Sequence, residues 1–372
     1  MDNITLMELY KIPENEYTII DIRDPLDFEY GHLPNAVNIT LNEIKDDHSV
    51  LPKDKMLILC CKSGMISAPL ADELRECGFN AVNLIDGYYG WLRCKFADES
   101  KIESVKKSLE TEFRYSIWDM FVKAIKKYKL VNNRDHIAVC ISGGKDSMLM
   151  AKLFYMLKEK NEIDFQVTYL VMDPGYSPIN RETIEKNAKS LGIPLTVFET
   201  NIFNYVYKLD KHPCYMCARL RRGNLYSQAQ KLGCNKIALG HHYDDVIETI
   251  LMGMIYGGQI QTMMPKLHSE NFEGMEIIRP LYLVREDEIK RWRDYNDLQF
   301  IQCACRFTDT CTTCNPTGTG SKRQEVKRLI AELKETNINI EDNIFSSIEN
   351  VNLNYVLEYK SHNKRHYFMD NY

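Results

Sequence analysis

The stretch SGGKDS at residues 142–147 places two glycines, two serines, a lysine and an aspartate between two apolar segments. Glycines let a backbone approach phosphate oxygens, serine hydroxyls donate hydrogen bonds, and a following helix N-terminus favours an anion. The lysine follows the second glycine directly, which excludes a Walker loop, and the G-x-G-x-x-G fingerprint is absent too. The stretch therefore predicts a phosphate-binding turn of another kind. The alternative is a glycine-rich turn without a ligand.

Paired cysteines form a second group of reactive side chains. Cys214 and Cys217 are three residues apart at a proline-marked helix start, so both sulfurs can meet one metal centre. Arg219, Arg221 and Arg222 follow them, and thiolates beside several cations suit a metal cluster next to an anionic substrate. A zinc site or a buried pair is the alternative. Four later cysteines have a C-x-C-x5-C-x2-C spacing that can bind zinc by itself: Cys303, Cys305, Cys311 and Cys314.

Carboxylates gather in the polar turn GHHYDD, which lies between an apolar run and an apolar-periodic stretch. Asp244 or Asp245 could bind magnesium or act as a base, and Asp146 in the glycine-rich turn is another magnesium candidate. An aspartate at such a place also caps helices, and both roles can hold at once.

The second of two adjacent cysteines, Cys61, ends the apolar run MLILCC and precedes a short loop and a helix. Loop N–H groups and the helix dipole lower a thiol pKa and can hold a negatively charged sulfur species. The alternative is a strand-end cysteine without a role. Cys60 is expected to point into the core, because neighbours on a strand alternate faces.

Alternating strands and helices must position these residues. Short β-rich runs and one helix predict a compact α/β unit over residues 1–93, followed by a charge-rich, solvated helical linker at 94–115. The pattern then predicts helices at 117–131, 146–158 and 180–191, and strands at 136–141, 165–173, 194–200 and 236–240. Crossovers of this length imply a parallel sheet covered by helices.

Composition limits the class of protein. A chain of 372 residues with 44% hydrophobic and 27% charged residues is typical of two or three globular domains. Neither a signal peptide nor an apolar run of roughly 18–20 residues is visible, so we expect a cytoplasmic protein without a membrane partner. The net charge of -5 argues against a uniformly basic nucleic-acid binder, but leaves room for a local basic patch. Grouped cysteines among the 12 indicate metal or sulfur chemistry.

Residues 1–93 resemble the rhodanese-like sulfurtransferase family. The segments IIDIRDPLDFEYGHLPNAVNI and GYYGW flank the cysteine loop at the distances seen in that family. The resemblance implies that Cys61 carries a persulfide, and that Asp21, Arg23 and His32 brace the fold. The family loop often has an arginine where this chain has Ile66, which argues against efficient activity on small anions but not against a persulfide.

The SGGKDS stretch resembles the pyrophosphate loop of N-type ATP pyrophosphatases. Those enzymes cleave ATP between the α and β phosphates and adenylate a substrate oxygen. Together with CYMCARLRRG and GHHYDD, it makes residues 110–355 similar to the tRNA 2-thiocytidine synthetase family. The nucleotide-binding residues so implied are Ser142, Gly143, Gly144, Lys145, Asp146, Ser147, Met172, Gly240 and His241.

The second resemblance also implies a fold, cofactors and a product. The fold is an adenine nucleotide α-hydrolase-like parallel-sheet domain with a helical C-terminal part. The product is 2-thiocytidine at position 32 of the tRNA anticodon loop, made with ATP, magnesium and a 4Fe-4S cluster held by three cysteines. Two ligands would be Cys214 and Cys217. The third is expected to be Cys303, with Cys305, Cys311 and Cys314 as alternatives, as zinc ligands or as thiols in a sulfur relay.

The two resemblances divide the chain into functional parts. We expect a rhodanese-like domain at 1–95, a helical linker and lead-in helix at 96–131, a PP-loop thiolation domain at 132–358 and a loose polar tail at 359–372. Sulfur would pass from a cysteine desulfurase or another donor to Cys61 and then to the second domain. A homodimer is expected from the family.

Basic residues are the expected contacts with tRNA. Arg219, Arg221 and Arg222 are candidate RNA contacts, and the basic helix at 322–328 offers either phosphate contacts or a solvated face. That helix contributes Lys322, Arg323, Lys327 and Arg328. The competing functions are thiolation of another base or of a small molecule, and a zinc-binding, ATP-dependent sulfur-carrier module. Lysidine-type amidation shares the ATP loop, but requires neither the C-x-x-C pair nor the fused domain.

Overall fold

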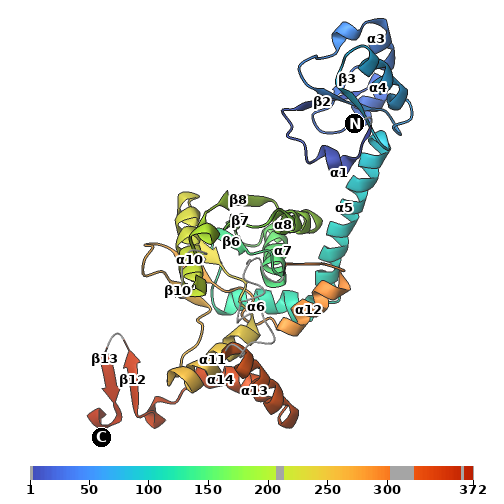
Figure 1. Ribbon diagram of the computed structural model, residues 1–372. Helices are drawn as coiled ribbons and strands as arrows, with labels where there is room; N and C mark the ends of the chain where they lie inside the picture. Colours follow the sequence, from blue (N-terminus) through green and yellow to red (C-terminus); the bar gives the residue numbers. More distant parts are fainter. Residues whose placement is uncertain (1–2, 207–212, 302–321, 362–363, 372) are drawn as a thin grey trace. The chain divides into compact units, whose positions relative to one another are not determined.

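A computed structural model describes residues 3–206, 213–301, 322–361 and 364–371 (Figure 1). The chain divides into two compact units, Met1–Lys101 and Ile102–Tyr372, and each is described by itself. Both are α/β units built on a mainly parallel sheet, which confirms the predicted fold class.

Unit 1 has a five-stranded parallel sheet in the order β1-β5-β4-β2-β3. Its strands are β1 (Asn3–Ile4), β2 (Tyr17–Asp21), β3 (Val37–Asn38), β4 (Met56–Cys60) and β5 (Ala81–Leu84). Its helices are α1 (Leu6–Leu9), α2 (Pro25–Tyr30), α3 (Leu41–Asp46), α4 (Ser67–Glu76) and the first part of α5 (Gly87–Glu110). The apolar strand β4 lies at the centre, as predicted from its composition.

Strand β4 supplies both faces of the unit 1 core because its neighbouring side chains alternate. Leu57, Leu59 and Cys61 enter one apolar cluster, and Ile58 and Cys60 enter the other. Cys60 is fully buried, as predicted, and Cys61 begins the loop at the carboxyl end of the strand.

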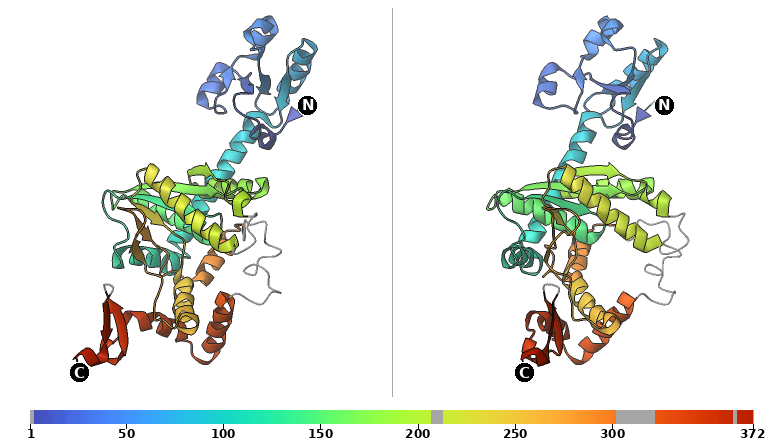
Figure 2. Two further views of the ribbon diagram at one scale, coloured as in Figure 1. Left: turned by 60° about the vertical axis from the view of Figure 1, so that its left-hand side comes forward. Right: turned by 90° about the vertical axis from the view of Figure 1, so that its left-hand side faces the viewer.

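Unit 2 has a six-stranded sheet in the order β10-β11-β9-β6-β7-β8. Its strands are β6 (His136–Ile141), β7 (Gln166–Asp173), β8 (Leu195–Glu199), β9 (Lys236–Ala238), β10 (Lys266–His268) and β11 (Glu276–Ile278). The four strands predicted from sequence pair in parallel, and β10 adds an antiparallel edge that the sequence did not predict. Helices cover both faces of this sheet (Figure 2).

The helices around this sheet are α6 (Asp119–Lys127), α7 (Lys145–Lys160), α8 (Pro178–Leu191), α9 (Ile202–Val206), α10 (Pro213–Lys231), α11 (Tyr243–Gly257) and α12 (Glu286–Tyr295). Helices α7 and α8 pack on one face of β6, and α10 packs on the other. The chain runs from β6 outward to β7 and β8, then returns to β9 on the opposite side of β6. Open α/β sheets bind ligands at such a switch point, outside the carboxyl ends of the strands.

Two segments differ from the sequence prediction. The expected solvated linker is wrong for the end of α5, because Val105 and Leu109 are fully buried in the core of unit 2 together with Phe113. Their spacing of four residues places them on one face of a helix. The C-terminal tail is not loose: β12 (Glu358–Ser361) and β13 (Lys364–Tyr367) pair as an antiparallel hairpin, with Tyr359 stacked on His366.

The predicted helical C-terminal part is confirmed. Helices α13 (Lys322–Thr336) and α14 (Ile340–Glu349) pack against α11. The shared apolar cluster includes Val246 and Ile250 of α11, Val326 of α13 and Phe345 of α14.

Candidate functional site

The SGGKDS turn connects β6 to α7 at the switch point of unit 2. Gly143 has φ +85, and a Cβ there would lie 2.5 Å from Ile301 Cδ1 and 2.7 Å from Ile184 Cγ1, so only glycine fits. Ser147 Oγ accepts a hydrogen bond from Ser142 N at 3.1 Å and donates one to Gly144 O at 3.0 Å. The turn is thus held in shape by its own residues.

A cavity of about 330 Å³ opens beside this turn, at the carboxyl ends of β6, β7 and β9. Six of the predicted nucleotide residues line it: Ser142, Asp146, Ser147, Met172, Gly240 and His241. Arg221 of α10, a predicted RNA contact, and Asp245 of α11, a predicted catalytic residue, also line the cavity. Segments more than 100 residues apart therefore form one concave site at the place where α/β sheets bind ligands.

Two predicted nucleotide residues face a neighbouring cavity instead. Gly144 and Lys145 line a hollow of about 670 Å³ on the side of α12. Lys145 Nζ lies 3.1 Å from Asp146 Oδ1 and 3.2 Å from Glu286 Oε1, so its charge is balanced within unit 2.

Gly240 fixes how closely β9 approaches the phosphate turn. A Cβ at this position would lie 3.1 Å from Ser147 N and 3.2 Å from Asp146 C, both backbone atoms at the start of α7. A side chain here would force this backbone to shift by a few tenths of an ångström, so glycine lets the segment after β9 close this wall of the cavity.

His241 follows Gly240 and contributes a polar atom without a partner. Its Nδ1 is buried and makes no hydrogen bond to any described residue. Burial lowers the pKa of His241 to about 4, so the imidazole is neutral at neutral pH. Buried polar atoms are nearly always hydrogen-bonded, and a bound ligand would supply the missing partner. The glycine cradle, the two hydroxyls and this nitrogen suit a nucleotide.

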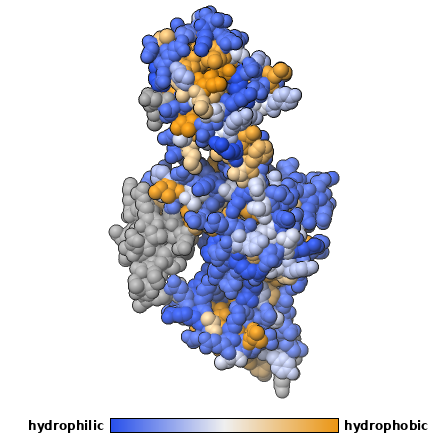
Figure 3. All heavy atoms as spheres, turned by 90° about the vertical axis from the view of Figure 1, so that its right-hand side faces the viewer, coloured by the Kyte–Doolittle hydropathy of each residue, from blue (hydrophilic) through white to orange (hydrophobic). Residues whose placement is uncertain are grey.

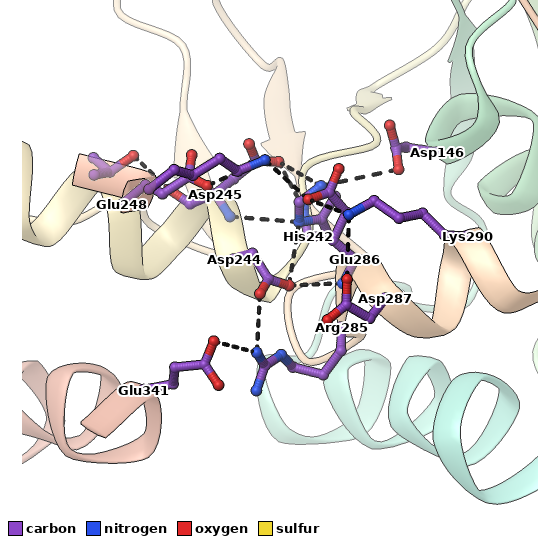
Figure 4. A network of polar contacts seen from close by, with 12 residues as sticks. Asp146, His242, Asp244, Asp245, Glu248, Arg285, Glu286, Asp287, Lys290 and Glu341 are labelled. Atoms are coloured by element: carbon purple, nitrogen blue, oxygen red, sulfur yellow. Dashed lines mark hydrogen bonds and ion pairs between the residues drawn. The ribbon is translucent and has the colours of Figure 1, made fainter. Parts of the chain in front are cut away.

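The two adjacent aspartates of α11 have different environments (Figure 4). Asp245 lines the cavity, and its carboxylate accepts a hydrogen bond from His242 N at 3.1 Å. Asp244 points to α12, where it accepts hydrogen bonds from Arg285 Nη2 at 3.0 Å and Glu286 N at 2.7 Å. The cavity therefore contains the carboxylates of Asp245 and Asp146, whereas Asp244 joins two helices.

A charged cluster that the sequence did not reveal supports these aspartates (Figure 4). Glu286 lies 2.9 Å from Lys327 and 3.3 Å from Lys290. Burial alone would raise the pKa of Glu286, but the hydrogen bond from Lys327 and the charges of Lys145 and Lys327 lower it strongly. Arg323 pairs with Glu248 at 2.7 Å and with Asp245 at 3.2 Å. Two of the predicted phosphate contacts, Arg323 and Lys327, are thus engaged with carboxylates.

No sequence signal points to Arg285, Glu286 or Glu248, because their partners come from distant segments. His242 could have been noticed, since a polar residue three positions before an acidic one is typical of a helix start. Its side chain caps α11 in a reciprocal pair with Asp245.

Helix α10 begins at Pro213, as its sequence predicted. Cys217 packs against the apolar cluster of Met172, Ile202 and Val206, which puts it next to a residue of the cavity wall. Arg221 lines the cavity, and Arg219 and Arg222 are exposed.

Only Cys217 of the predicted cysteine ligands of a metal has its side chain in the described part of the chain. The side chain of Cys214 and the residues Cys303, Cys305, Cys311 and Cys314 lie outside the described part of the chain. Within the described residues, no group of three or more histidine, cysteine, aspartate or glutamate side chains has a metal-binding arrangement.

In unit 1, the loop after β4 wraps around the sulfur of Cys61. Its Sγ accepts hydrogen bonds from Gly64 N at 3.1 Å and Ser67 Oγ at 3.2 Å. Burial alone would raise the pKa of Cys61, but the bonds from Ser67 and from backbone N–H groups of the loop outweigh it and lower the pKa below its usual range. The loop thus favours a negatively charged sulfur.

Buried contacts hold this loop in place. Arg23 forms a fully buried pair with Asp21 at 2.7 Å and lies 3.8 Å above the ring of Tyr88. Tyr88 N donates a hydrogen bond to Cys61 O at 2.8 Å. The contacts of Asp21 and Arg23 are of the bracing kind that the resemblance implied. His32, by contrast, is exposed and stacks on the partly buried Phe28 at 4.0 Å.

Exposed apolar side chains surround the cysteine loop. Met65 and Ile66 within it are 77% and 55% exposed, and Tyr89 on α5, whose N–H donates to Lys62 O, is 49% exposed. Apolar side chains also gather on the face of unit 1 drawn in the upper part of Figure 3. Met65 and Ile66 therefore offer apolar surface, and no positive charge that could attract a small anion.

Comparison with known proteins agrees with this geometry. A family model described as PP-loop domain matches residues 111–306, and one described as rhodanese-like domain matches residues 5–94. A protein of Anaeromyxobacter dehalogenans named tRNA-cytidine(32) 2-sulfurtransferase is 33% identical over 243 residues, or 64% of this chain and 80% of the relative. A protein of the same name from Burkholderia multivorans is 34% identical over 232 residues, or 62% and 67%. The chain belongs to the tRNA-cytidine(32) 2-sulfurtransferase family.

A solved structure of a tRNA thiolase is also similar to this chain. The U34-tRNA thiolase NcsA from Methanococcus maripaludis, determined with its 4Fe-4S cluster, is similar at 22% identity and a TM-score of 0.48. The match covers 62% of this chain and 76% of that one.

We predict that Gly240→Ala weakens ATP binding by this PP-loop protein about tenfold or more, because the new Cβ displaces the start of α7. Calorimetric titration of the whole chain measures the effect. Gly257→Ala is the matched control, because nothing lies within 4 Å of its Cβ position and it should bind ATP like the wild type. Wild-type affinity in the Gly240 variant would refute the predicted role of this contact.

We predict that Ser67→Ala raises the pKa of the Cys61 thiol, because it removes a hydrogen bond to the thiolate. The midpoint of the pH–rate profile for alkylation at Cys61, followed by mass spectrometry, should move up by about one unit. Ser67 Oγ also lies 2.7 Å from Asn83 Oδ1 and has a single hydrogen to share. An unchanged midpoint would mean that this hydrogen goes to Asn83. Ser49→Ala, which removes an exposed hydroxyl bonded to Asp47, is the control.

Proposed function

We propose that the protein is an ATP-dependent tRNA thiolase that forms 2-thiocytidine at position 32 of the anticodon loop. The observation that carries this proposal is the cavity that joins the phosphate turn to Asp245, His241 and Arg221. Its geometry suits adenylation of a substrate, and the names of the relatives supply the substrate and the position.

The chemistry proceeds by activation and replacement. The base oxygen attacks the α phosphorus of ATP, pyrophosphate leaves, and sulfur then displaces AMP from the activated carbon. Ser142, Ser147 and the N-terminus of α7 hold the phosphates of ATP. Asp146 and Asp245, whose carboxylates line the same cavity, would hold magnesium beside them. Asp244 would keep α11 in place through Arg285.

A three-cysteine cluster would be bound by Cys214, Cys217 and one cysteine of the 303–314 segment. In its favour, Cys217 packs against the apolar cluster that includes Met172 of the cavity wall. When bound, such a cluster supplies an iron with an open position for sulfide. A zinc site in the 303–314 segment is the alternative use of its four cysteines.

Cys61 would bring sulfur to the reaction as a persulfide. Transfer to another thiolate breaks the S–S bond, leaves Cys61 as a thiolate and forms a new persulfide, so no outside oxidant is needed. Delivery of the outer sulfur to the base at the sulfide level then takes two electrons, which a second thiol would supply by forming a disulfide with the sulfur-carrying cysteine. The exposed Met65 and Ile66 favour a protein donor, such as a cysteine desulfurase, over a small anion. Residues 1–95 would thus supply sulfur to the thiolation domain at 132–358.

Substrate binding and cellular setting complete the proposal. Arg221 in the cavity wall, with the exposed Arg219 and Arg222 on the same helix, would contact tRNA phosphates. None of the helices in the described ranges is long and apolar enough to cross a membrane. We propose that the protein acts in the cytoplasm as a homodimer.

Mass analysis of tRNA nucleosides tests the function directly. Cells that lack the gene should lose 2-thiocytidine and retain other thionucleosides, and the wild-type gene should restore it. Loss of a thiouridine instead would assign another base, and an unchanged set of thionucleosides would overturn the proposal.

We predict that Cys61→Ala abolishes thiolation with a persulfide-carrying protein donor but leaves thiolation with excess free sulfide within about twofold. Only thiolation with the protein donor needs a thiolate on unit 1. Because unit 1 is tethered to unit 2, it raises the local concentration of sulfur. Product formation is measured on purified tRNA under anaerobic conditions. Cys77→Ala, which removes an exposed cysteine of the same unit, should behave as wild type with both donors. Equal losses with both donors would count against the relay.

A further inference from the structure

Arg279 lies at the carboxyl edge of the unit 2 sheet, one strand beyond the nucleotide cavity. It follows β11 directly, and β11 runs parallel to β9, whose continuation Leu239 donates a hydrogen bond to Ile278 O at 3.0 Å. The residues that follow β9 and β11 are therefore neighbours at this edge. The charge of Arg279 accordingly contributes to the low pKa of His241 in the cavity wall.

The guanidinium of Arg279 has few partners. Nη1 donates a hydrogen bond to Met264 O, and the buried Nε has no partner in the described part of the chain. No carboxylate of the described residues lies within 4.0 Å of it, although Arg23, Arg285 and Arg323 each pair with one. Burial lowers the pKa of Arg279, and the charge of Asp245, which is not in contact with the guanidinium, offsets this effect only in part.

Two other polar side-chain atoms near Arg279 make no hydrogen bond of standard geometry to any described residue, Thr262 Oγ1 and His241 Nδ1, although the Thr262 hydroxyl lies close enough to Tyr282 to lower the pKa of that phenol. Thr262 belongs to the segment after α11 that runs past Arg279, where Arg279 N donates to Pro265 O at 2.9 Å. Tyr282 lies close to both Thr262 and Arg279. Three segments thus meet with incomplete hydrogen bonding, which a folded protein rarely tolerates without a ligand.

An oxyanion would satisfy Arg279 and Thr262 together. A guanidinium presents planar N–H donors that match phosphate oxygens, and the threonine hydroxyl adds one more donor. The ATP phosphates belong in the cavity at the N-terminus of α7, and Arg279 is absent from the lining of that cavity. His241 lines that cavity and is close enough to Arg279 for the charge of Arg279 to lower its pKa. The anion at Arg279 therefore belongs to the second substrate.

We propose that Arg279 and Thr262 form a binding site for a backbone phosphate of the tRNA nucleotide that is thiolated. This inference rests on the proposed function. A base that reacts must leave its stack, and holding the adjacent phosphate would fix the flipped nucleotide with its base directed toward His241 and the cavity. Such a contact gives orientation and affinity but no base specificity.

Binding of unmodified tRNA to the whole protein, measured over a range of salt concentrations, tests this site. Arg279→Gln should weaken tRNA binding about tenfold and reduce the slope of log affinity against log salt by about 0.7–0.9, as the loss of one phosphate contact does. ATP affinity should stay within about twofold of wild type. Arg291→Gln is the matched control, because Arg291 is an exposed arginine whose partners are Glu112 and Glu288. It should leave both affinities unchanged.

A modified RNA identifies the phosphate. Anticodon stem-loops that carry a neutral methylphosphonate on the 5′ or 3′ side of the target cytidine should bind the wild type more weakly at one of the two positions. Arg279→Gln should not distinguish that RNA from the unmodified stem-loop, since both lack the same contact. Thr262→Val, which removes only the hydroxyl, should show a smaller loss of the same kind.

The outcomes separate this site from the function on which it rests. Wild-type tRNA affinity and salt slope in Arg279→Gln would overturn the site alone, as would a loss confined to ATP binding. Failure of the wild-type protein to bind tRNA would overturn the site and the function together. Loss of folding would indicate a structural role and overturn the site, because removing a cation without a counterion should leave the melting temperature unchanged or raise it.

Discussion

The structure of unit 2 depends on the close approach of Gly240 to the backbone at the start of α7. This contact brings the segment after β9 against the phosphate turn after β6. It thereby places His241 and Asp245 on the same cavity as Ser142 and Ser147. The order of the strands makes the approach possible, because β6 and β9 are neighbours although 94 residues of chain separate Ser142 from Lys236. A side chain at position 240 would push this segment away from the start of α7 and widen the cavity between them.

Charge is balanced unevenly around this site. On the side of α12 and α13, cations and carboxylates alternate: Lys145, Lys290 and Lys327 around Glu286, and Arg323 between Asp245 and Glu248. These pairs hold α11, α12 and α13 in register behind the cavity. On the side of β11, Arg279 is half-buried without a carboxylate partner among the described residues. Pairs of the first kind stabilise the scaffold, whereas a half-buried cation that no carboxylate contacts is more typical of a place where substrate charge arrives.

The sequence predicted the parts of the protein whose signal is local. Strand β6, helix α7 and the turn between them follow from a β-rich apolar run, two glycines and an apolar-periodic stretch, and Cys61 follows in the same way from the run that forms β4. The different roles of Asp244 and Asp245 were not predictable, because the partner that separates them, Arg285, lies about 40 residues away. The hairpin after α14 was missed because its stability depends on cross-strand pairs such as Tyr359 with His366. Its strands are too short for an alternation of apolar and polar residues to be visible in a polar tail.

Both units use the same device, a buried central strand of a parallel sheet followed by a loop that surrounds an anion at a helix N-terminus. They differ in where the anion comes from. In unit 1 the sulfur of Cys61 is part of the chain itself, and it already accepts hydrogen bonds from Gly64 N and Ser67 Oγ. In unit 2 the anion is a ligand, and without it His241 Nδ1 keeps no partner among the described residues. The loop of unit 1 thus favours the charged form of its own sulfur, whereas the proposed phosphate ligand would add stability to unit 2 when it binds.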